Sequence, residues 1–224
     1  MLIDARGLIK IFPAPVFSGS RPLYALAGID LQAGPGVLGL EGPNGGGKTT
    51  LLKTLAGILE ADGGTIFAGG ETADAGQLRG LAAYSPSNPR AFYFRLSAAE
   101  NLRFFGALAG LSPAQVLERS TGLADKLGFS PADMERRFDR ISEGNMQKVS
   151  LIRSFSRRPA LLLLDEPFRG LDQSACRGLL ELIKETGRDR ALMISSHNHE
   201  LLREAAGRII TMEAGKIKDS GGRT

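Results

Sequence analysis

The chain has 224 residues, 42% of them hydrophobic and 23% charged, and these proportions exclude wholesale disorder. Its net charge of +4 comes from residues 81–160, where twelve Lys and Arg face seven Asp and Glu, without the dense basic stripe that is typical of nucleic-acid binders. No apolar run approaches the roughly 20 residues of a membrane-spanning helix, and the single cysteine excludes an internal disulfide framework.

The first third of the chain is predicted to contain strands, turns and one helix. The N-terminus has an acid at Asp4 and no long apolar core, so no secretory signal peptide is expected. A proline-rich segment, residues 13–22, interrupts regular structure. Short apolar stretches predict strands at residues 8–12, 25–31, 36–40 and 65–68. Leucines and isoleucines at helical spacing predict a helix over residues 51–59.

The middle of the chain, residues 88–158, is predicted to be helical. Three serines at helix starts carry this prediction, because a serine side chain can bond the free amides of a first helical turn. They are Ser97 with Glu100 three residues on, Ser112 before Pro113, and Ser130 before Pro131.

After Pro159 the chain is predicted to alternate between strands and helices. The strands are expected at residues 161–164, 191–195 and 208–212, and the helices at 174–185 and 199–206. Such alternation is typical of a parallel α/β sheet, which here receives a helical insertion.

The segment Gly42-x-x-x-x-Gly47-Lys48-Thr49 matches the P-loop pattern. Backbone amides must point at phosphate oxygens in such a loop, and Gly45, Gly46 and Gly47 leave them unobstructed. Lys48 can reach the β- and γ-phosphates, and the Thr49 hydroxyl can bind Mg²⁺. The plain alternative is a glycine-rich turn before a helix, but a strand before the loop and a helix after it favour the P-loop.

Two carboxylates, Asp165 and Glu166, end the apolar run Leu161 to Leu164. Strand alternation predicts that they point to opposite sides and have different roles. Asp165 suits a Mg²⁺ shell, and Glu166 could orient or deprotonate an attacking water. The alternative is an acidic strand end facing solvent, which the presence of a P-loop makes the weaker interpretation.

Together these residues resemble the nucleotide-binding subunit of ABC transporters, in the family's order and over nearly the whole chain. Gly42 to Thr50 resembles the Walker A motif, and Leu161 to Glu166 resembles Walker B with its catalytic glutamate. Ile141-Ser-Glu-Gly-Asn145 lies where the signature Leu-Ser-Gly-Gly-Gln is expected. Gly170-Leu171-Asp172 is similar to the D-loop, and His197 to the switch histidine.

The resemblance implies an α/β fold: a P-loop NTPase core with a RecA-like parallel sheet, an N-terminal antiparallel β subdomain and an inserted α-helical subdomain. Residues 1–224 would form a single ABC ATPase domain. The core would take about residues 1–87 and 159–224, and the helical subdomain about residues 88–158.

The resemblance also implies a function, with ATP and Mg²⁺ as cofactors. Such a subunit hydrolyses ATP in a head-to-tail homodimer or heterodimer. It is a peripheral protein at the cytoplasmic face of the cell membrane, where it works with separate integral membrane subunits. No nucleic-acid partner is expected. Residues 96–105 resemble ABC-2 type exporters, which makes export the expected direction. The implied site residues are Lys48, Glu166 and His197 (catalytic), Phe12, Asn44, Gly45, Gly46, Gly47, Lys48, Thr49 and Thr50 (ATP), Thr49 and Asp165 (metal), Ser142, Gly144 and Asn145 (signature, acting on the opposite subunit) and Asp172 (D-loop).

Three residues depart from the family pattern. Glu143 replaces a glycine and Asn145 a glutamine of the signature, and Ser87 stands in place of the glutamine of the segment Tyr-x-Pro-Gln. Two other functions stay open: an ABC ATPase outside transport, and a nucleotide-dependent interaction module with weak hydrolysis, which the departures at Ser87 and Glu143 favour.

Two assignments from the residues also stay open. Phe17 and Tyr24 compete with Phe12 for stacking on adenine. The aromatic and basic segment Arg90 to Arg95 is either core of the helical region or a docking surface for a membrane subunit.

Overall fold

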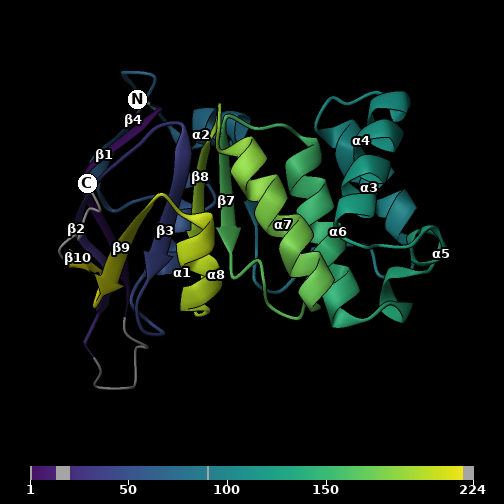
Figure 1. Ribbon diagram of the computed structural model, residues 1–224. Coiled ribbons are helices and arrows are strands. Elements are labelled where there is room, and N and C mark those ends of the chain that lie inside the picture. The colour runs from purple at the N-terminus through teal and green to yellow at the C-terminus, as the bar shows by residue number, and fades with distance from the viewer. Residues whose placement is uncertain (1, 14–20, 90, 219–224) are drawn as a thin grey trace.

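The computed structural model describes residues 2–13, 21–89 and 91–218 (Figure 1). The strands are β1 (Ile3–Phe12), β2 (Leu23–Ala33), β3 (Gly36–Glu41), β4 (Gly63–Ala68), β5 (Glu71–Thr72), β6 (Ala82–Ser85), β7 (Leu161–Asp165), β8 (Ala191–Ser195), β9 (Arg208–Glu213) and β10 (Lys216–Lys218). The helices are α1 (Lys48–Leu55), α2 (Ala75–Leu81), α3 (Ala98–Leu108), α4 (Pro113–Lys126), α5 (Pro131–Met134), α6 (Glu143–Ser156), α7 (Gln173–Thr186) and α8 (His199–Ala205), with a 3-10 turn η1 (Phe138–Arg140).

Two sheets and a helical region make up the fold. The antiparallel sheet has the strand order β2-β1-β4-β5, and the second sheet has the order β10-β9-β3-β8-β7-β6. Strands β9, β3, β8, β7 and β6 run parallel, and β10 is antiparallel to β9. Figure 1 shows α3, α4 and α5 at the end of the molecule farthest from the antiparallel sheet. This is the predicted fold class, an α/β core with an antiparallel sheet and a helical insertion.

The leucine run of β7 lies at the centre of the parallel sheet. All five residues of the strand are buried. Leu162 and Leu164 pack into the apolar cluster shared with the helical region, whereas Leu161 and Leu163 pack into the cluster between the two sheets. A continuous apolar run is therefore explained by a strand that is covered on both faces. The strand delivers its last residue, Asp165, to the carboxyl edge of the sheet.

Several element boundaries differ from the prediction. Strand β1 begins at Ile3 rather than residue 8, because the buried Ile3 and Ala5 alternate with the polar Asp4 and Arg6, and β2 extends two residues beyond the predicted stretch at each end. Helix α1 ends at Leu55, whereas the prediction extended it to residue 59. Gly57, two residues after the end of the helix, takes a left-handed conformation with φ of 67°. The short elements β5, α2, β6 and β10 were not predicted, since they lack a long periodic pattern.

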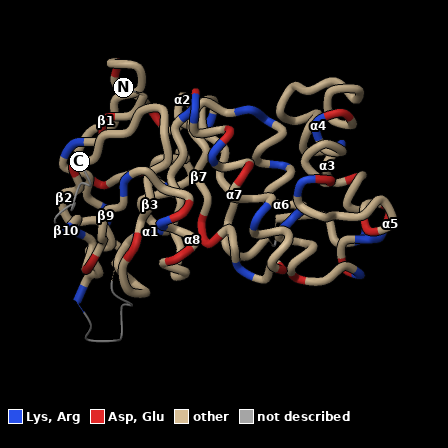
Figure 2. Tube along the Cα trace, viewed as in Figure 1, with Lys and Arg blue, Asp and Glu red and all other residues tan. Residues whose placement is uncertain are grey.

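The helical middle of the chain follows its predicted caps. Ser97 and Glu100 form a reciprocal capping box at the start of α3, and Ser112 caps α4 with Pro113 in the first turn. Ser130 caps α5, which is only four residues long. Helix α7 carries both basic and acidic residues along its length, whereas α6 has Glu143 at its start and then only Lys148 and Arg153 (Figure 2). In the described parts of the chain, no helix has the length and apolar character that crossing a membrane requires.

Candidate active site

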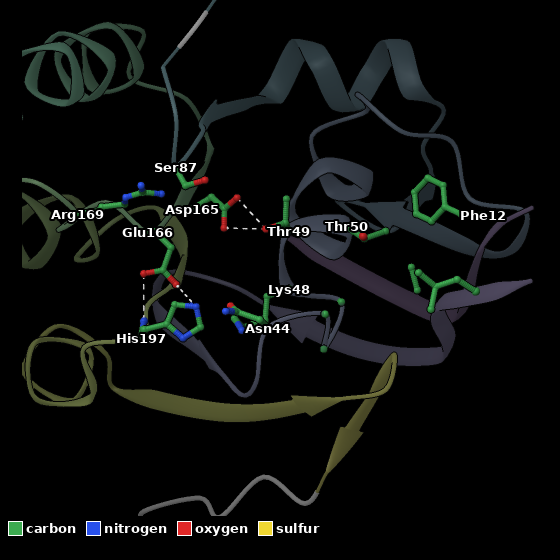
Figure 3. A pocket seen from close by; sticks show the side chains of 15 residues that line it. Phe12, Asn44, Lys48, Thr49, Thr50, Ser87, Asp165, Glu166, Arg169 and His197 are labelled. Atoms are coloured by element: carbon green, nitrogen blue, oxygen red, sulfur yellow. Dashed lines mark hydrogen bonds and ion pairs between the residues drawn. The ribbon is translucent and has the colours of Figure 1, made fainter. Parts of the chain in front are cut away.

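A pocket of about 610 Å³ lies at the carboxyl edge of the parallel sheet. It receives side chains from the loop between β3 and α1, from the ends of β7 and β8, and from the antiparallel sheet (Figure 3). Its lining residues are Phe12, Leu23, Ala25, Asn44, Gly45, Gly46, Gly47, Lys48, Thr49, Thr50, Ser87, Asp165, Glu166, Arg169 and His197. The pocket thus brings together the predicted P-loop, the acidic pair, the predicted switch histidine and Phe12.

The glycines of the loop between β3 and α1 are required by its geometry. Gly45 and Gly47 have φ of 78° and 102°, a region that strains other residues. A Cβ atom on Gly46 would stand 2.6 Å from the carbonyl oxygen of Met212, and one on Gly47 would collide with the carbonyl oxygen of Ala25. The loop is thereby packed against β9 and β2, and its amides lead into the N-terminus of α1. This arrangement can bind an anion.

Lys48 is the first residue of α1, and its side chain folds back onto the loop that precedes the helix. Its Nζ donates hydrogen bonds to the carbonyl oxygens of Gly42 (2.6 Å) and Pro43 (3.0 Å), and the residue is only 7% exposed. Burial lowers the pKa of the ammonium group, and the negative charges of Glu166 and Asp165 oppose that shift. The ammonium is held at the floor of the pocket, where a phosphate over the loop would meet it.

The Asp165 carboxylate is fixed by three hydroxyl donors. Thr49 Oγ1 lies 2.9 Å from Oδ2 and 3.1 Å from Oδ1, Tyr84 donates to Oδ2 at 3.0 Å, and Ser195 donates to Oδ1 at 2.6 Å. Burial, together with the charge of Asp165, raises the pKa of the Tyr84 phenol well above its ordinary value, so this hydroxyl stays a donor. The carboxylate and the Thr49 hydroxyl therefore face each other in a fixed geometry.

This pair offers the oxygen ligands that Mg²⁺ prefers. Within the described ranges, no group of three or more His, Cys, Asp and Glu residues could hold a metal ion by itself. Thr49 and Asp165 would therefore bind the ion together with oxygens of a bound phosphate and of water. The donor set fits Mg²⁺.

Glu166 does not follow the predicted strand alternation. The strand ends at Asp165, and Glu166 takes a left-handed conformation with φ of 50°, held by its amide, which donates to the carbonyl oxygen (3.0 Å) and the hydroxyl (3.1 Å) of Ser195. Both carboxylates consequently line the same pocket. The prediction of opposite sides is wrong because the backbone leaves the strand between the two residues.

His197 is the partner of Glu166. The backbone amide of His197 donates to Glu166 Oε2 at 3.1 Å, and the imidazole Nε2 lies 3.3 Å from Oε1 without hydrogen-bond alignment. Oε1 is buried and has no hydrogen-bond donor among the described residues. A buried carboxylate oxygen of this kind can accept a proton from a water placed in the pocket.

Of the three aromatic candidates for adenine stacking, the described residues include two. Phe12 lines the pocket at the end of β1 (Figure 3). Tyr24 is exposed and does not belong to the lining. Phe17 lies outside the described residues.

The predicted signature residues lie at the N-terminus of α6 and do not line the pocket of the same chain. Ser142 caps the helix by accepting a hydrogen bond from the amide of Asn145 at 3.2 Å. A Cβ atom on Gly144 would collide with the carbonyl oxygen of Gly170. Gly144 is therefore required for close packing between α6 and the loop that follows β7. This structural role of the glycine could not be predicted from the sequence.

Asp172 ties the same loop to α6. Its carboxylate caps α7 through the amide of Ala175 (2.9 Å) and accepts a hydrogen bond from the buried Nζ of Lys148 (3.1 Å). The hydroxyl of Ser174, the Ala175 amide and Lys148 hold the pKa of Asp172 well below its ordinary value. The predicted signature and D-loop segments thus form one packed unit.

Three residues of the site were missed from the sequence. Tyr84 and Ser195 fix Asp165: Tyr84 is the last-but-one residue of β6, Ser195 is the last residue of β8, and both strands pair with β7. Arg169 lines the pocket from the loop after β7. Tyr84 and Ser195 could have been considered from the sequence, because the carboxyl ends of parallel strands meet at the same edge of a sheet.

Comparisons with known proteins agree with this site. A family model described as ABC transporter matches residues 26–169. A putative ABC transporter ATP-binding protein of Synechocystis sp. is 34% identical over 92% of this chain and 71% of its own length. The phosphonates import ATP-binding protein PhnC of Hyphomonas neptunium is 30% identical, with 90% of this chain and 81% of that protein covered. The ABC transporter ATP-binding protein NatA of Bacillus subtilis is 32% identical, with 81% and 74% covered.

Solved structures with a similar fold are also ATP-binding subunits and cassettes. An ATP-binding subunit of an ABC transporter superposes with a TM-score of 0.85 at 26% identity, covering 99% of this chain and 90% of that one. A dimeric ATP-binding cassette bound to ADP and Pi has a TM-score of 0.84 at 19% identity over both whole chains, a likeness of fold. The family model spans more than half of the chain, and relatives reach 30% identity or more, so the chain belongs to the ABC transporter family, as an ATP-binding domain with ATPase activity.

Proposed function

We propose that this protein is the ATP-hydrolysing motor subunit of an ABC transporter, which couples ATP turnover in a head-to-tail dimer to transport through separate membrane subunits. One observation carries the proposal. A glycine cradle with a buried lysine faces, in one pocket, both a fixed Asp165–Thr49 pair and a Glu166 carboxylate whose Oε1 accepts no hydrogen bond from the described residues.

The phosphates of ATP would lie over the loop from Asn44 to Thr50. Its amides and the N-terminus of α1 stabilise negative charge, and the Lys48 ammonium would exchange its carbonyl partners for phosphate oxygens. Mg²⁺, held by Thr49 and Asp165, would neutralise charge that develops on the phosphates. Phe12 would stack on adenine at the open side of the pocket.

Glu166 would act as the general base. Its Oε1 would accept a proton from the attacking water, while the amide of His197 holds the other carboxylate oxygen. The exposed imidazole of His197 stands at the edge of the pocket, from which it could contact the terminal phosphate. Together these groups orient the water and stabilise the transferred phosphoryl group.

The second half of the site would come from another subunit. Ser142, Gly144 and Asn145 sit at the N-terminus of a 14-residue helix, a position that favours phosphate, yet they do not line their own pocket. A P-loop and a signature that lie apart on one chain fit a head-to-tail arrangement, which closes as a two-fold dimer with two composite sites. The dimer contains either two copies of this chain or a related partner.

Membrane subunits would dock on the helical region. Phe92 of the segment Arg90 to Arg95 is core, since it is buried and stacks on Phe138 at 4.5 Å. The neighbouring Tyr93 and Phe94 are 52% and 42% exposed, which favours a docking surface. The protein would then work peripherally at the cytoplasmic face of the membrane. We propose export as the direction because residues 96–105 resemble ABC-2 type exporters.

A second candidate is a nucleotide-dependent module that acts outside transport. Ser87 in the pocket and Glu143 at the start of α6 favour it, since both depart from the family pattern. The complete set of Lys48, Asp165 and Glu166 favours the motor. The steady-state ATPase rate with and without the membrane subunits separates the two, because only a motor is stimulated by them.

The same assay tests Ser87. The serine side chain is too short to replace a glutamine directly at Mg²⁺, and a bridging water would cost at most about 2 kcal/mol. We expect Ser87→Ala to leave the basal ATPase rate of the isolated subunit nearly unchanged and to act, if at all, on stimulation by the membrane partner. A collapse of the basal rate would show that Ser87 takes part in hydrolysis.

A further inference from the structure

Arg169 brings a second permanent cation into the pocket. It lies in the loop between β7 and α7, and its backbone amide donates to the carbonyl oxygen of Glu166 at 3.2 Å, which fixes it in a tight turn beside that carboxylate. Figure 3 shows its side chain extending toward Ser87 and Asp165, on the side of the pocket opposite the glycine loop. The guanidinium therefore stands across the pocket from Lys48.

The charge balance of the pocket gives this residue a role. Among the described lining residues, the basic side chains are Lys48 and Arg169, apart from the imidazole of His197, and the carboxylates are Asp165 and Glu166. Without Arg169 the lining side chains would carry one more negative than positive charge. Mg²⁺ bound at Thr49 and Asp165 would offset one carboxylate. The last phosphate of an incoming polyphosphate must lie beside Glu166 for that residue to direct a water at it, and there it would still meet the repulsion of the second carboxylate.

Glu143 competes for the same guanidinium. Its Oε1 lies 3.9 Å from Nη2 of Arg169, and both side chains are more than 60% exposed. An exposed pair at this distance is worth little, and a phosphate offers a guanidinium stronger, bidentate hydrogen bonds. Arg169 can therefore leave Glu143 at small cost when a phosphate enters.

We propose that Arg169 binds the terminal phosphate of the nucleotide in its own pocket and makes the site prefer a nucleoside triphosphate over a diphosphate. The inference rests on the proposed function, since it requires the nucleotide to lie over the glycine loop. Lys48 reaches phosphates from the loop, and Arg169 reaches only the phosphate that projects toward Glu166. A diphosphate lacks that group.

The test compares the affinities of the full-length protein for a non-hydrolysable ATP analogue and for ADP. Binding is measured at protein concentrations where light scattering shows no association. Arg169→Ala is expected to weaken binding of the analogue about tenfold, the loss of a charge-assisted hydrogen bond, and to leave the ADP affinity within about twofold. Arg169→Lys should recover part of the loss. Arg177→Ala is the matched control, an exposed arginine of α7 outside the lining, and should change neither affinity.

Each other outcome has a definite meaning. Unchanged affinity for the analogue in Arg169→Ala, equal loss for both nucleotides, or a loss that appears only when the protein associates would overturn the proposal. Glu143→Gln should leave the affinity for the analogue equal or higher, and a fall would contradict the competition. Lys48→Ala is measured in the same assay. If Lys48→Ala also binds both nucleotides with wild-type affinity, the assignment of the phosphate site itself is wrong.

Discussion

Replacing Glu166 with glutamine is expected to lower the ATPase rate by about 10²–10⁴-fold, the usual cost of removing a general base. Glutamine keeps the shape of the side chain and can still accept the hydrogen bond from the His197 amide, so the pocket should keep its geometry. ATP binding would persist without turnover. Two copies should therefore stay joined around ATP.

The measurement combines steady-state hydrolysis with light scattering in the presence of ATP and Mg²⁺. Glu181→Gln, an exposed change on α7, is the control and should keep both the wild-type rate and the wild-type dissociation. A mutant that hydrolyses ATP normally and stays monomeric would show that both the role of Glu166 and the sandwich arrangement are wrong. Co-expression with a second ABC subunit checks the case of a heterodimer.

Replacing Lys48 with alanine is expected to abolish tight nucleotide binding. Lys48 is the one side-chain cation of the loop from Gly42 to Thr50, and losing two charge-assisted bonds to phosphates costs about 100-fold or more in affinity. Both ATP and ADP should be affected, unlike in Arg169→Ala.

Two controls separate binding from folding in that experiment. Lys48 also holds the carbonyl oxygens of Gly42 and Pro43, so thermal unfolding of Lys48→Ala and of the longer Lys48→Met should be compared with wild type. Lys53→Ala, in the last turn of the same helix, removes a lysine outside the pocket. Wild-type affinity for a non-hydrolysable ATP analogue in a folded Lys48→Ala would refute the P-loop assignment.

Much of the site could be predicted because its signals are local. The P-loop needs glycines at fixed positions before a helix, and the acidic pair ends an unmistakable leucine strand. Both features depend on neighbouring residues, and the structure brings them together through the pairing of parallel strands, with Asp165 opposite Ser195. The fold class followed from the same alternation of strands and helices.

The remainder depends on contacts across long separations. Tyr84 meets Asp165 over 81 residues of sequence and Ser195 meets it over 30, and neither pair has a periodic signature. The turn at Glu166 was missed because strand alternation holds only inside a strand, and the left-handed φ of 50° ends it. Arg169 lacked any signal, since its meaning comes from facing Lys48 across a pocket that only folding creates.

The most direct test of a composite ATP site is a mixing experiment with two inactive variants. Lys48→Ala removes the P-loop cation, and Ser142→Arg blocks the predicted signature. In a head-to-tail dimer of one copy of each, a single site combines an intact P-loop with an intact signature. In a one-to-one mixture, half of the dimers contain one copy of each variant, and each of these dimers has one intact site of two. The mixture should therefore recover about a quarter of the wild-type ATPase rate. A mixture as inactive as its two components would show that Lys48 and Ser142 do not meet across a shared site.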